Sequence, residues 1–203
     1  MLVLRKLVLA LVLVWLEQEL PAATWADAKE AMFPSADGRY LFHVVPRVHA
    51  LGRLRREPQA PDDGVPSLYG SLEVCFGTLL RFENGYYQPV WRAKLINAVA
   101  PNWVIPSHDG EAVVTLGNWA NQGNEDHLIA VYGAAGKLLR KLKIEDIYSK
   151  EEIARLLESS AGIHWSGATR IDAKKNLFVM ELPTVGRELR IDLRSGATIK
   201  AVE

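Results

Sequence analysis

The segment PSHDGEAVVTLG at residues 106–117 repeats the pattern of PSADGRYLFHVV at residues 34–45. Each segment has Pro-Ser, one further residue, Asp-Gly, and then a stretch rich in apolar residues. An Asp-Gly pair accepts the positive backbone φ angles of a tight turn, so the pattern predicts a turn that leads into a β-strand. A third and degenerate copy is RIDAKKNLFVME at residues 170–181, in which Lys175-Asn176 takes the place of Asp-Gly.

A hairpin-like segment follows each copy. In the second copy it is LIAVYGAAGKLLRKLKI (128–144), and in the third it is RELRIDLRSGATIKAV (187–202). In the first copy, EVCFGTLLRFENGYYQPVWRAKL (73–95) comes after an insert, residues 46–66, which is rich in proline and arginine. The insert has no strand periodicity and the composition of an exposed loop. The sequence therefore predicts about three degenerate repeats within a single β-rich domain, residues 29–203.

Most apolar runs after the N-terminal segment are short, contain β-branched or aromatic residues, and are bounded by turn dipeptides such as Asn84-Gly85. These features are typical of an all-β protein built mainly from antiparallel sheets. The predicted strands are Tyr40–Val45, Ser71–Phe76, Leu79–Phe82, Tyr87–Leu95, Trp103–Ile105, Ala112–Leu116, Leu128–Tyr132, Lys137–Ile144, Leu177–Leu182, Arg187–Leu193 and Thr198–Val202.

The sequence predicts one short interior helix, over residues 150–159. Ser149 and Glu152 have the spacing of a capping box, in which each side chain bonds the backbone N–H of the other residue. Ile153, Leu156 and Leu157 would then lie on one face of the helix. We expect this helix to be a connector that packs its apolar face on a sheet.

The turn motif and the hairpin together resemble a known family. S-x-D-G before a strand, followed by V-Y-x-x-x-G-K-L-L-R at residues 131–140, resembles the blades of β-propellers of the WD40 and YVTN/TolB-like kinds. Residues 99–146 in particular are similar to blades of uncharacterised exported bacterial proteins. The resemblance implies that the Asp-Gly turn joins two inner strands of a blade and that the G-K-L-L-R stretch forms an outer strand.

The sequence departs from the propeller pattern in two ways. It contains no Trp-Asp dipeptide, and about three copies are fewer than the roughly four to eight blades of an ordinary propeller. Three blade-like sheets would form a partial propeller, recruit strands from residues 79–105 as an extra blade, or pair with another chain. Each of these arrangements must also protect the edges of its sheets from unwanted pairing.

Composition excludes several classes of protein. The 203 residues include 24 Lys+Arg and 24 Asp+Glu, and this balance argues against a protein that coats nucleic acid. A single cysteine, Cys75, excludes an intrachain disulfide scaffold and a Cys-rich zinc module. Cys75 lies in an apolar run, where we expect a buried thiol.

Residues 1–28 read as a signal peptide. Arg5 and Lys6 precede the apolar run at residues 7–16, and small residues follow, so that cleavage after Ala23 or Ala28 is expected. The run is too short to span a bilayer, which needs about 20 apolar residues. The sequence therefore predicts a secreted or periplasmic protein with no stable membrane span after cleavage. The alternatives are a buried N-terminal helix and an uncleaved anchor.

The most polar loop lies between two strongly apolar predicted strands and is our candidate ligand or ion loop. Its oxygen-bearing side chains suit a hard cation such as Ca²⁺, although their spacing is not that of a known calcium loop. The alternative is a solvated hairpin loop in which Trp119 packs over a sheet edge. The candidate residues are Asn118, Trp119, Asn121, Asn124, Glu125, Asp126 and His127.

Two further groups of residues are candidates for binding. The insert carries a cluster of arginines that could contact an anionic partner, with a solvated charged loop as the alternative. These arginines are Arg47, Arg53, Arg55 and Arg56. A set of aromatic residues could form a surface that stacks on sugars, with packing inside the sheets as the alternative. These aromatic residues are Tyr86, Tyr87, Trp91, Trp103, Trp119 and Trp165.

The sequence contains no HExxH, G-x-S-x-G, Walker A or G-x-G-x-x-G motif. It therefore predicts an exported propeller-like binding module without a cofactor, with a protein or a glycan as its partner and no nucleic acid. Association of several copies is one way to complete its open sheets. The alternative function is a hydrolase or lyase, with a site in the loop Asn118–His127 that a metal assists and in which Glu125, Asp126 and His127 carry the chemistry.

Overall fold

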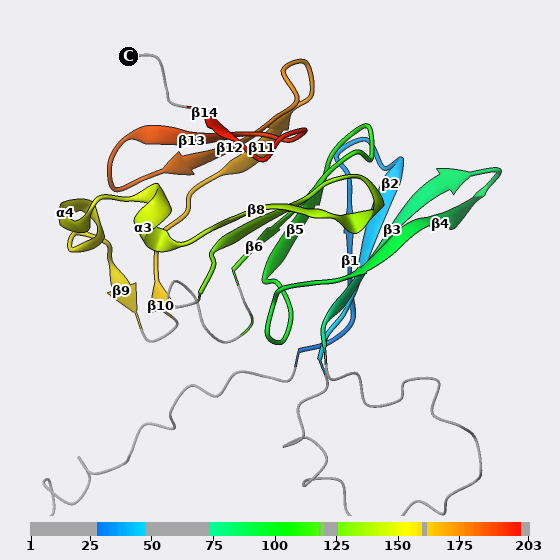
Figure 1. Ribbon diagram of the computed structural model, residues 1–203, viewed down its shortest axis with the longest axis horizontal. Helices are drawn as coiled ribbons and strands as arrows, with labels where there is room; N and C mark the ends of the chain where they lie inside the picture. The colour runs from blue at the N-terminus through cyan, green and yellow to red at the C-terminus, as the bar shows by residue number, and fades with distance from the viewer. Residues whose placement is uncertain (1–27, 48–73, 118, 120–125, 160–161, 200–203) are drawn as a thin grey trace, which may run out of the picture.

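The computed structural model describes residues 28–47, 74–117, 119, 126–159 and 162–199. Within this part of the chain, three four-stranded antiparallel sheets follow one another and lie in a row (Figure 1). Each sheet is a meander, in which every strand pairs with the next strand in sequence. The predicted all-β fold, built mainly from antiparallel sheets, is confirmed.

The first sheet consists of β1 (Ala31–Pro34), β2 (Tyr40–Val45), β3 (Phe76–Glu83) and β4 (Tyr86–Lys94). Its register places Phe33, Phe42, Leu79 and Trp91 in one line across the four strands. A β-bulge follows this line, between Leu79 and Leu80 of β3 and their partners in β4. The hairpin of β3 and β4 extends well beyond the rest of the sheet, at the right of Figure 1.

The second sheet consists of β5 (Trp103–Pro106), β6 (Val113–Leu116), β7 (Ile129–Tyr132) and β8 (Leu138–Leu142). A short 3₁₀ turn, η1 (Ala134–Gly136), joins β7 to β8 at the predicted Ala135-Gly136 turn. The third sheet consists of β11 (Thr169–Asp172), β12 (Leu177–Leu182), β13 (Arg187–Asp192) and β14 (Thr198–Ile199). The G-K-L-L-R stretch leads into β8, which is one of the two edge strands of this sheet.

The two Pro-Ser-x-Asp-Gly segments form the same turn, which joins the first two strands of the first and second sheets. The serine Oγ donates to the aspartate Oδ1, at 2.8 Å for Ser35 and Asp37 and at 2.6 Å for Ser107 and Asp109. The same Oγ accepts the backbone N–H five residues further on, at 3.0 Å in both turns. Each aspartate also accepts the N–H two residues after it. The same two side chains, a serine and an aspartate, thus close each of the two turns.

The two turns also contact each other. Arg39 Nη2 donates to the carbonyl oxygen of His108 at 2.8 Å, and its Nε bonds Asp37 Oδ2 at 2.5 Å. Burial would raise the pKa of Asp37, but hydrogen bonds from Ser35 and Arg39 outweigh that effect and lower the pKa to about 2. Asp37 is therefore charged at neutral pH, and Arg39 links the first sheet to the second.

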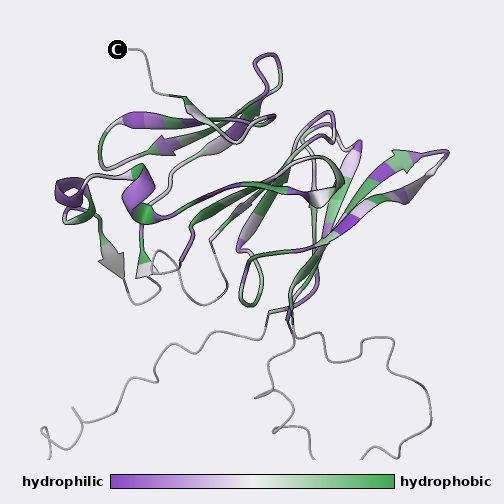
Figure 2. Ribbon diagram, viewed as in Figure 1, coloured by the Kyte–Doolittle hydropathy of each residue, from purple (hydrophilic) through white to green (hydrophobic). Residues whose placement is uncertain are grey.

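The core lies on both sides of the second sheet. All residues of β6 and β7 are buried, which is the pattern of strands covered on both faces. On one face, Val113, Ala130 and Tyr132 pack against the first sheet. On the other face, Val114 and Val131 pack against the third sheet. The second sheet is therefore the middle layer, and Figure 2 shows its hydrophobic strands between the other two sheets.

The connection between the second and third sheets contains two short helices, α3 (Ile144–Ile147) and α4 (Lys150–Ile153), and a small two-stranded ladder of β9 (Glu158–Ser159) and β10 (Gly162–Ile163). The predicted capping box is confirmed: Ser149 Oγ accepts the N–H of Glu152, and Glu152 Oε2 accepts the N–H of Ser149. Arg187 Nη2 donates to the carbonyl of Ile147 at 2.7 Å and so fastens the helices to the third sheet.

The predicted helix over residues 150–159 is correct in its start and too long in its extent. Regular α-helix ends at Ile153, the next residues form turns with tighter hydrogen bonds, and β9 follows at residues 158–159. Leu156 is buried as expected, but Leu157 is 73% exposed because the chain has left the helix before it. The short helix α3 was not predicted: its first residue, Ile144, was assigned to the end of a strand, and the residues after it were assigned to no element.

The predicted strands differ from the observed ones at a few places. The strands β1 and β11 were not predicted, since both are short and carry prolines or charges. The predicted strand Leu79–Phe82 is part of the longer strand β3, and the predicted strand Ser71–Phe76 overlaps β3 only at Phe76, with residues 71–73 outside the described part of the chain. Cys75 precedes it and is buried as predicted, and burial raises the pKa of its thiol to about 12.

The row of sheets is open: in the described part of the chain no sheet closes, either on itself or with the others into a ring. Among the same residues, no helix has the length and apolar character needed to cross a membrane. Most of the predicted signal peptide and most of the arginine-rich insert lie outside the described residues.

Candidate functional site

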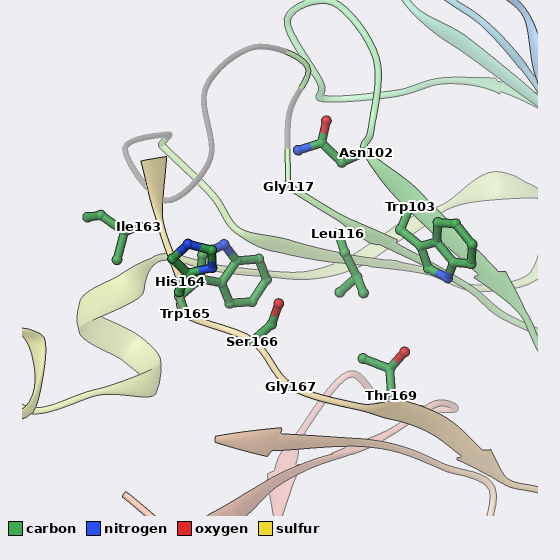
Figure 3. A pocket seen from close by; sticks show the side chains of 10 residues that line it. All are labelled: Asn102, Trp103, Leu116, Gly117, Ile163, His164, Trp165, Ser166, Gly167 and Thr169. Carbon is green, nitrogen blue, oxygen red and sulfur yellow. The ribbon is translucent and has the colours of Figure 1, made fainter. Parts of the chain in front are cut away.

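A pocket of about 270 Å³ opens between the second and third sheets. Three segments form its walls: the start of β5 with the residue before it, the end of β6, and the stretch that leads from β10 to β11. Its lining residues, drawn in Figure 3, are Asn102, Trp103, Leu116, Gly117, Ile163, His164, Trp165, Ser166, Gly167 and Thr169.

The wall formed by the stretch between β10 and β11 is held firmly in place. The Tyr148 hydroxyl donates to the carbonyl oxygen of Trp165, whose indole is only 5% exposed and belongs to the core. The N–H of Gly167 donates to the carbonyl of Glu181 at 2.9 Å, and the N–H of Glu181 donates back to Ala168 at 2.9 Å. The segment therefore presents the side chains of its exposed residues from a fixed backbone.

The wall from the second sheet is equally well bonded. The N–H of Asn102 donates to the carbonyl of Leu116 at 3.0 Å, and the N–H of Gly117 donates to Leu128 at 2.7 Å. The buried side chain of Asn97 donates to the carbonyl of Gly117 at 2.8 Å. These bonds join the beginning of β5 to the end of β6, so that both strands reach the pocket in fixed register.

The chemistry of the lining is aromatic and neutral. The Trp103 side chain is 57% exposed and makes a T-shaped contact with the Phe33 ring, with ring centroids 5.7 Å apart. In Figure 3 the Trp103 ring lies on one side of the pocket and His164 and Trp165 lie on the other, with Ser166 and Thr169 further along the segment that carries His164 and Trp165. The lining contains no Lys, Arg, Asp or Glu. The pocket thus combines an indole face with amide, hydroxyl and imidazole groups.

The candidate loop of residues 118–127 is described only in part. Asn118, Asn121, Asn124 and Glu125 lie outside the described residues, so the predicted Ca²⁺ or ligand role of the loop stays a prediction. Trp119 is half-buried and packs against the core between the first and second sheets, and its N–H donates to the carbonyl of Ala100 at 2.8 Å. That position fits the packing alternative for this tryptophan.

The last two residues of this loop, Asp126 and His127, have different surroundings. Asp126 is exposed, whereas His127 is 7% exposed. Burial, with a smaller contribution from the charge of Lys141, lowers the pKa of His127, and Asp126 opposes that change. His127 is therefore neutral at pH 7. Within the described residues, its Nε2 has no hydrogen-bond partner, and no group of three or more His, Cys, Asp or Glu is placed to hold a metal ion.

The other predicted binding residues are separated in the structure. Arg47 is exposed at the end of the described first segment, and its N–H donates to the carbonyl of Val99. Arg53, Arg55 and Arg56 lie outside the described residues. The aromatic set splits into three groups: Tyr86 and Tyr87 on the protruding hairpin, Trp91 and Trp119 against the core, and Trp103 and Trp165 in the pocket.

Sequence reasoning therefore found two of the pocket residues and missed the others. Asn102, Ser166 and Thr169 belong to no motif, and Asn102 comes from a stretch of the chain far from that of Ser166 and Thr169. The one signal in the sequence was the pair of tryptophans beside polar residues, Asn102-Trp103 and Trp165-Ser166. No protein-family model matches the sequence, and no curated protein matches it.

Proposed function

We propose that the protein is an exported, propeller-like binding module whose pocket between the second and third sheets takes a sugar unit of a glycan. The observation that carries this proposal is the exposed indole of Trp103 beside a set of neutral polar side chains. The signal-like segment at residues 1–28 supports export, and the three meander sheets of equal strand order support the propeller-like description.

The character of the pocket favours a sugar over other small ligands. A pyranose ring has an apolar face of C–H groups that stacks on an indole, while its hydroxyl groups need neutral donors and acceptors around the edge. Asn102, His164 and Ser166 offer such groups. A phosphate or carboxylate ligand would favour Arg or Lys, which the lining lacks.

The size and openness of the pocket favour one unit of a longer chain. A volume of about 270 Å³ is slightly below the roughly 300–1,000 Å³ of pockets that enclose a drug-sized molecule. One side is formed by a tryptophan that is still 57% exposed, so the ligand can continue outwards past it. Such a site holds the end or one residue of a glycan and leaves the neighbouring units in solvent.

Substitution of the exposed indole tests this proposal. We expect Trp103→Ala to weaken binding to the glycans that the wild-type protein selects on a glycan array by about 5- to 10-fold, which corresponds to about 1–1.4 kcal/mol of stacking energy. Ser166→Ala should weaken the same binding by a smaller factor, because it removes one hydrogen bond. The measurement is isothermal titration with the selected glycan.

Tyr86→Ala is the matched control, since Tyr86 is an aromatic residue of similar exposure, 59%, on the protruding hairpin. It should leave the affinity unchanged. Equal losses in both variants, or no loss in Trp103→Ala, would contradict a sugar site in the pocket. The alternative function, a hydrolase or lyase at Asn118–His127, would appear in the same experiment as cleavage of the glycan.

A further inference from the structure

The two end faces of the row of sheets have opposite character. The free face of the third sheet carries a set of paired charges. Arg170 Nη2 lies 2.7 Å from Glu188 Oε1, and Arg190 Nη2 lies 2.8 Å from Glu188 Oε2. Exposed Glu181 lies in the neighbouring strand β12, directly opposite Glu188. A charged face of this kind, in which two arginines pair with Glu188, is suited to contact with water.

The free face of the first sheet is largely apolar. Because Phe33, Phe42 and Leu79 face the second sheet, strand alternation directs their neighbours the other way. The side chains on this face, which we call the first-sheet outer face, are Glu30, Met32, Leu41, His43, Val45, Phe76, Thr78, Leu80, Phe82, Tyr87, Arg92 and Lys94. Met32 is 61% exposed and Phe82 is 51% exposed, and Figure 2 shows hydrophobic stretches along β3.

The few charges on the first-sheet outer face are segregated to its two margins. Glu30 lies at the β1 margin, with its Oε2 3.0 Å from His43 Nε2. Arg92 and Lys94 lie at the β4 margin, where the Arg92 guanidinium covers the Phe76 ring at 4.8 Å. The middle of the face, formed by β2 and β3 between these margins, is mostly apolar, with His43 and Thr78 as its polar residues. Two copies of this face are complementary when a two-fold axis parallel to the strands relates them. That rotation places the acidic β1 margin of one copy over the basic β4 margin of the other.

We propose that the first-sheet outer face binds a second copy of this chain, with the two sheets face to face around such a two-fold axis. Glu30 of each copy then lies opposite Arg92 and Lys94 of the other copy, and the exposed apolar side chains meet between these charges. In this dimer the two first sheets stack as neighbouring sheets of one chain already do. The six sheets then form one row, with the charged third sheet of each copy at its two ends.

The size of the face sets the strength of the contact. Four strands about 4.8 Å apart and about six residues of about 3.3 Å each give roughly 400 Å² of sheet per copy. Even when both copies are counted, this area is below the roughly 1,200–2,000 Å² of a standard stable interface. We therefore expect a dimer with a micromolar dissociation constant that separates on dilution.

Sedimentation velocity of the purified full chain over a wide concentration range tests this proposal. The wild-type protein should shift from monomer to dimer as its concentration rises. Leu80→Glu should raise the dissociation constant at least 10-fold, because Leu80 lies on β3 in the middle of the face and the substitution places a charge there. Leu157→Glu is the control: Leu157 is 73% exposed and lies far along the chain between the second and third sheets, and its substitution should change nothing.

Exchange of the marginal charges is a second, independent readout. Glu30→Arg and Arg92→Glu should each weaken the dimer several-fold, and the double variant should recover most of the wild-type affinity because it restores opposite charges across the axis. A wild-type protein that stays monomeric at every concentration, or one whose association is unchanged by Leu80→Glu and by the charge exchange, would overturn the proposal. Such results would instead indicate a different partner for this face or association through another part of the chain. The outcome is independent of glycan binding at the pocket.

Discussion

The two equivalent glycines of the Pro-Ser-x-Asp-Gly turns have the same backbone and different neighbours. Gly38 has φ of +71° and Gly110 has φ of +73°, a conformation that disfavours any side chain. A Cβ on Gly38 would meet nothing within 4 Å, whereas a Cβ on Gly110 would come within 2.3 Å of the Tyr40 ring. A substitution at Gly38 therefore tests backbone strain alone, whereas the same substitution at Gly110 tests backbone strain together with a steric clash between two sheets.

We expect Gly38→Ala to lower the free energy of unfolding by about 1–2 kcal/mol, which is the cost of the left-handed conformation alone. Gly110→Ala should cost about 1–3 kcal/mol more, because the Tyr40 ring must also move. Urea unfolding of both variants measures the difference. Equal losses would show that the Tyr40 ring yields freely and that the two turns are not packed as the structure has them.

The residues of these turns were predictable from sequence, and the reason is local. Ser35 and Asp37, like Ser107 and Asp109, bond to backbone groups within five residues, so their spacing alone specifies the turn. The pocket is the opposite case. Trp103 and Thr169 face a common space only because two sheets pack together, and no short pattern reports that packing.

At the scale of elements, Arg187 connects the third sheet to both short helices. Its Nη2 donates to the carbonyl of Ile147 at 2.7 Å and to Glu152 Oε2 at 3.0 Å, and its guanidinium lies 5.9 Å from the centre of the Tyr148 ring. Helices of four residues have little stability of their own, so tertiary bonds must hold them. Arg187 supplies such bonds to α3 and α4 together.

We expect Arg187→Met to lower the free energy of unfolding by about 1.5–3 kcal/mol, because a charged hydrogen bond to a backbone carbonyl is lost along with the ion pair. Arg170→Met is the control, since Arg170 is 53% exposed and, among the described residues, its guanidinium bonds Glu188 alone. It should cost about 0–1 kcal/mol. Thermal unfolding followed by circular dichroism measures both, and a larger loss in Arg170→Met would contradict this role of Arg187.

The elements themselves were partly predictable. Strands with alternating or continuous apolar residues, such as β12 and β13, follow from their sequence, as does the capped start of α4. The short strand β1 ends in a proline and was missed, since it is a strand only because β2 offers it a partner. The helix over residues 150–159 was predicted too long because periodicity does not show that the ladder of β9 and β10 takes the chain away.

At the scale of the whole molecule, the second sheet belongs to two cores at once. Its residues contribute to the cluster shared with the first sheet and to the cluster shared with the third sheet. Loss of either cluster exposes one full face of the middle sheet, and the remaining pair of sheets then loses much of its burial. The three sheets should therefore unfold together rather than one at a time.

We expect a single urea transition with the same midpoint by circular dichroism and by tryptophan fluorescence. Leu79→Ala in the first core and Ile191→Ala in the second should each lower the stability of that one transition by about 2–5 kcal/mol, because both side chains are fully buried. Separation of either variant's unfolding into two steps would show that the sheets are independent units.

The two-sided burial of the middle sheet also sets an order of events during synthesis. The segments Val113–Leu116 and Ile129–Tyr132 have almost no polar residues. Until both the first and the third sheet have formed, one apolar face of these strands is exposed and prone to aggregation. The first sheet precedes them along the chain and can cover one face as they emerge, but the other face waits for residues 169–199. The interval before the C-terminal sheet arrives is thus the moment of greatest aggregation risk, when the nascent chain most depends on a holding chaperone.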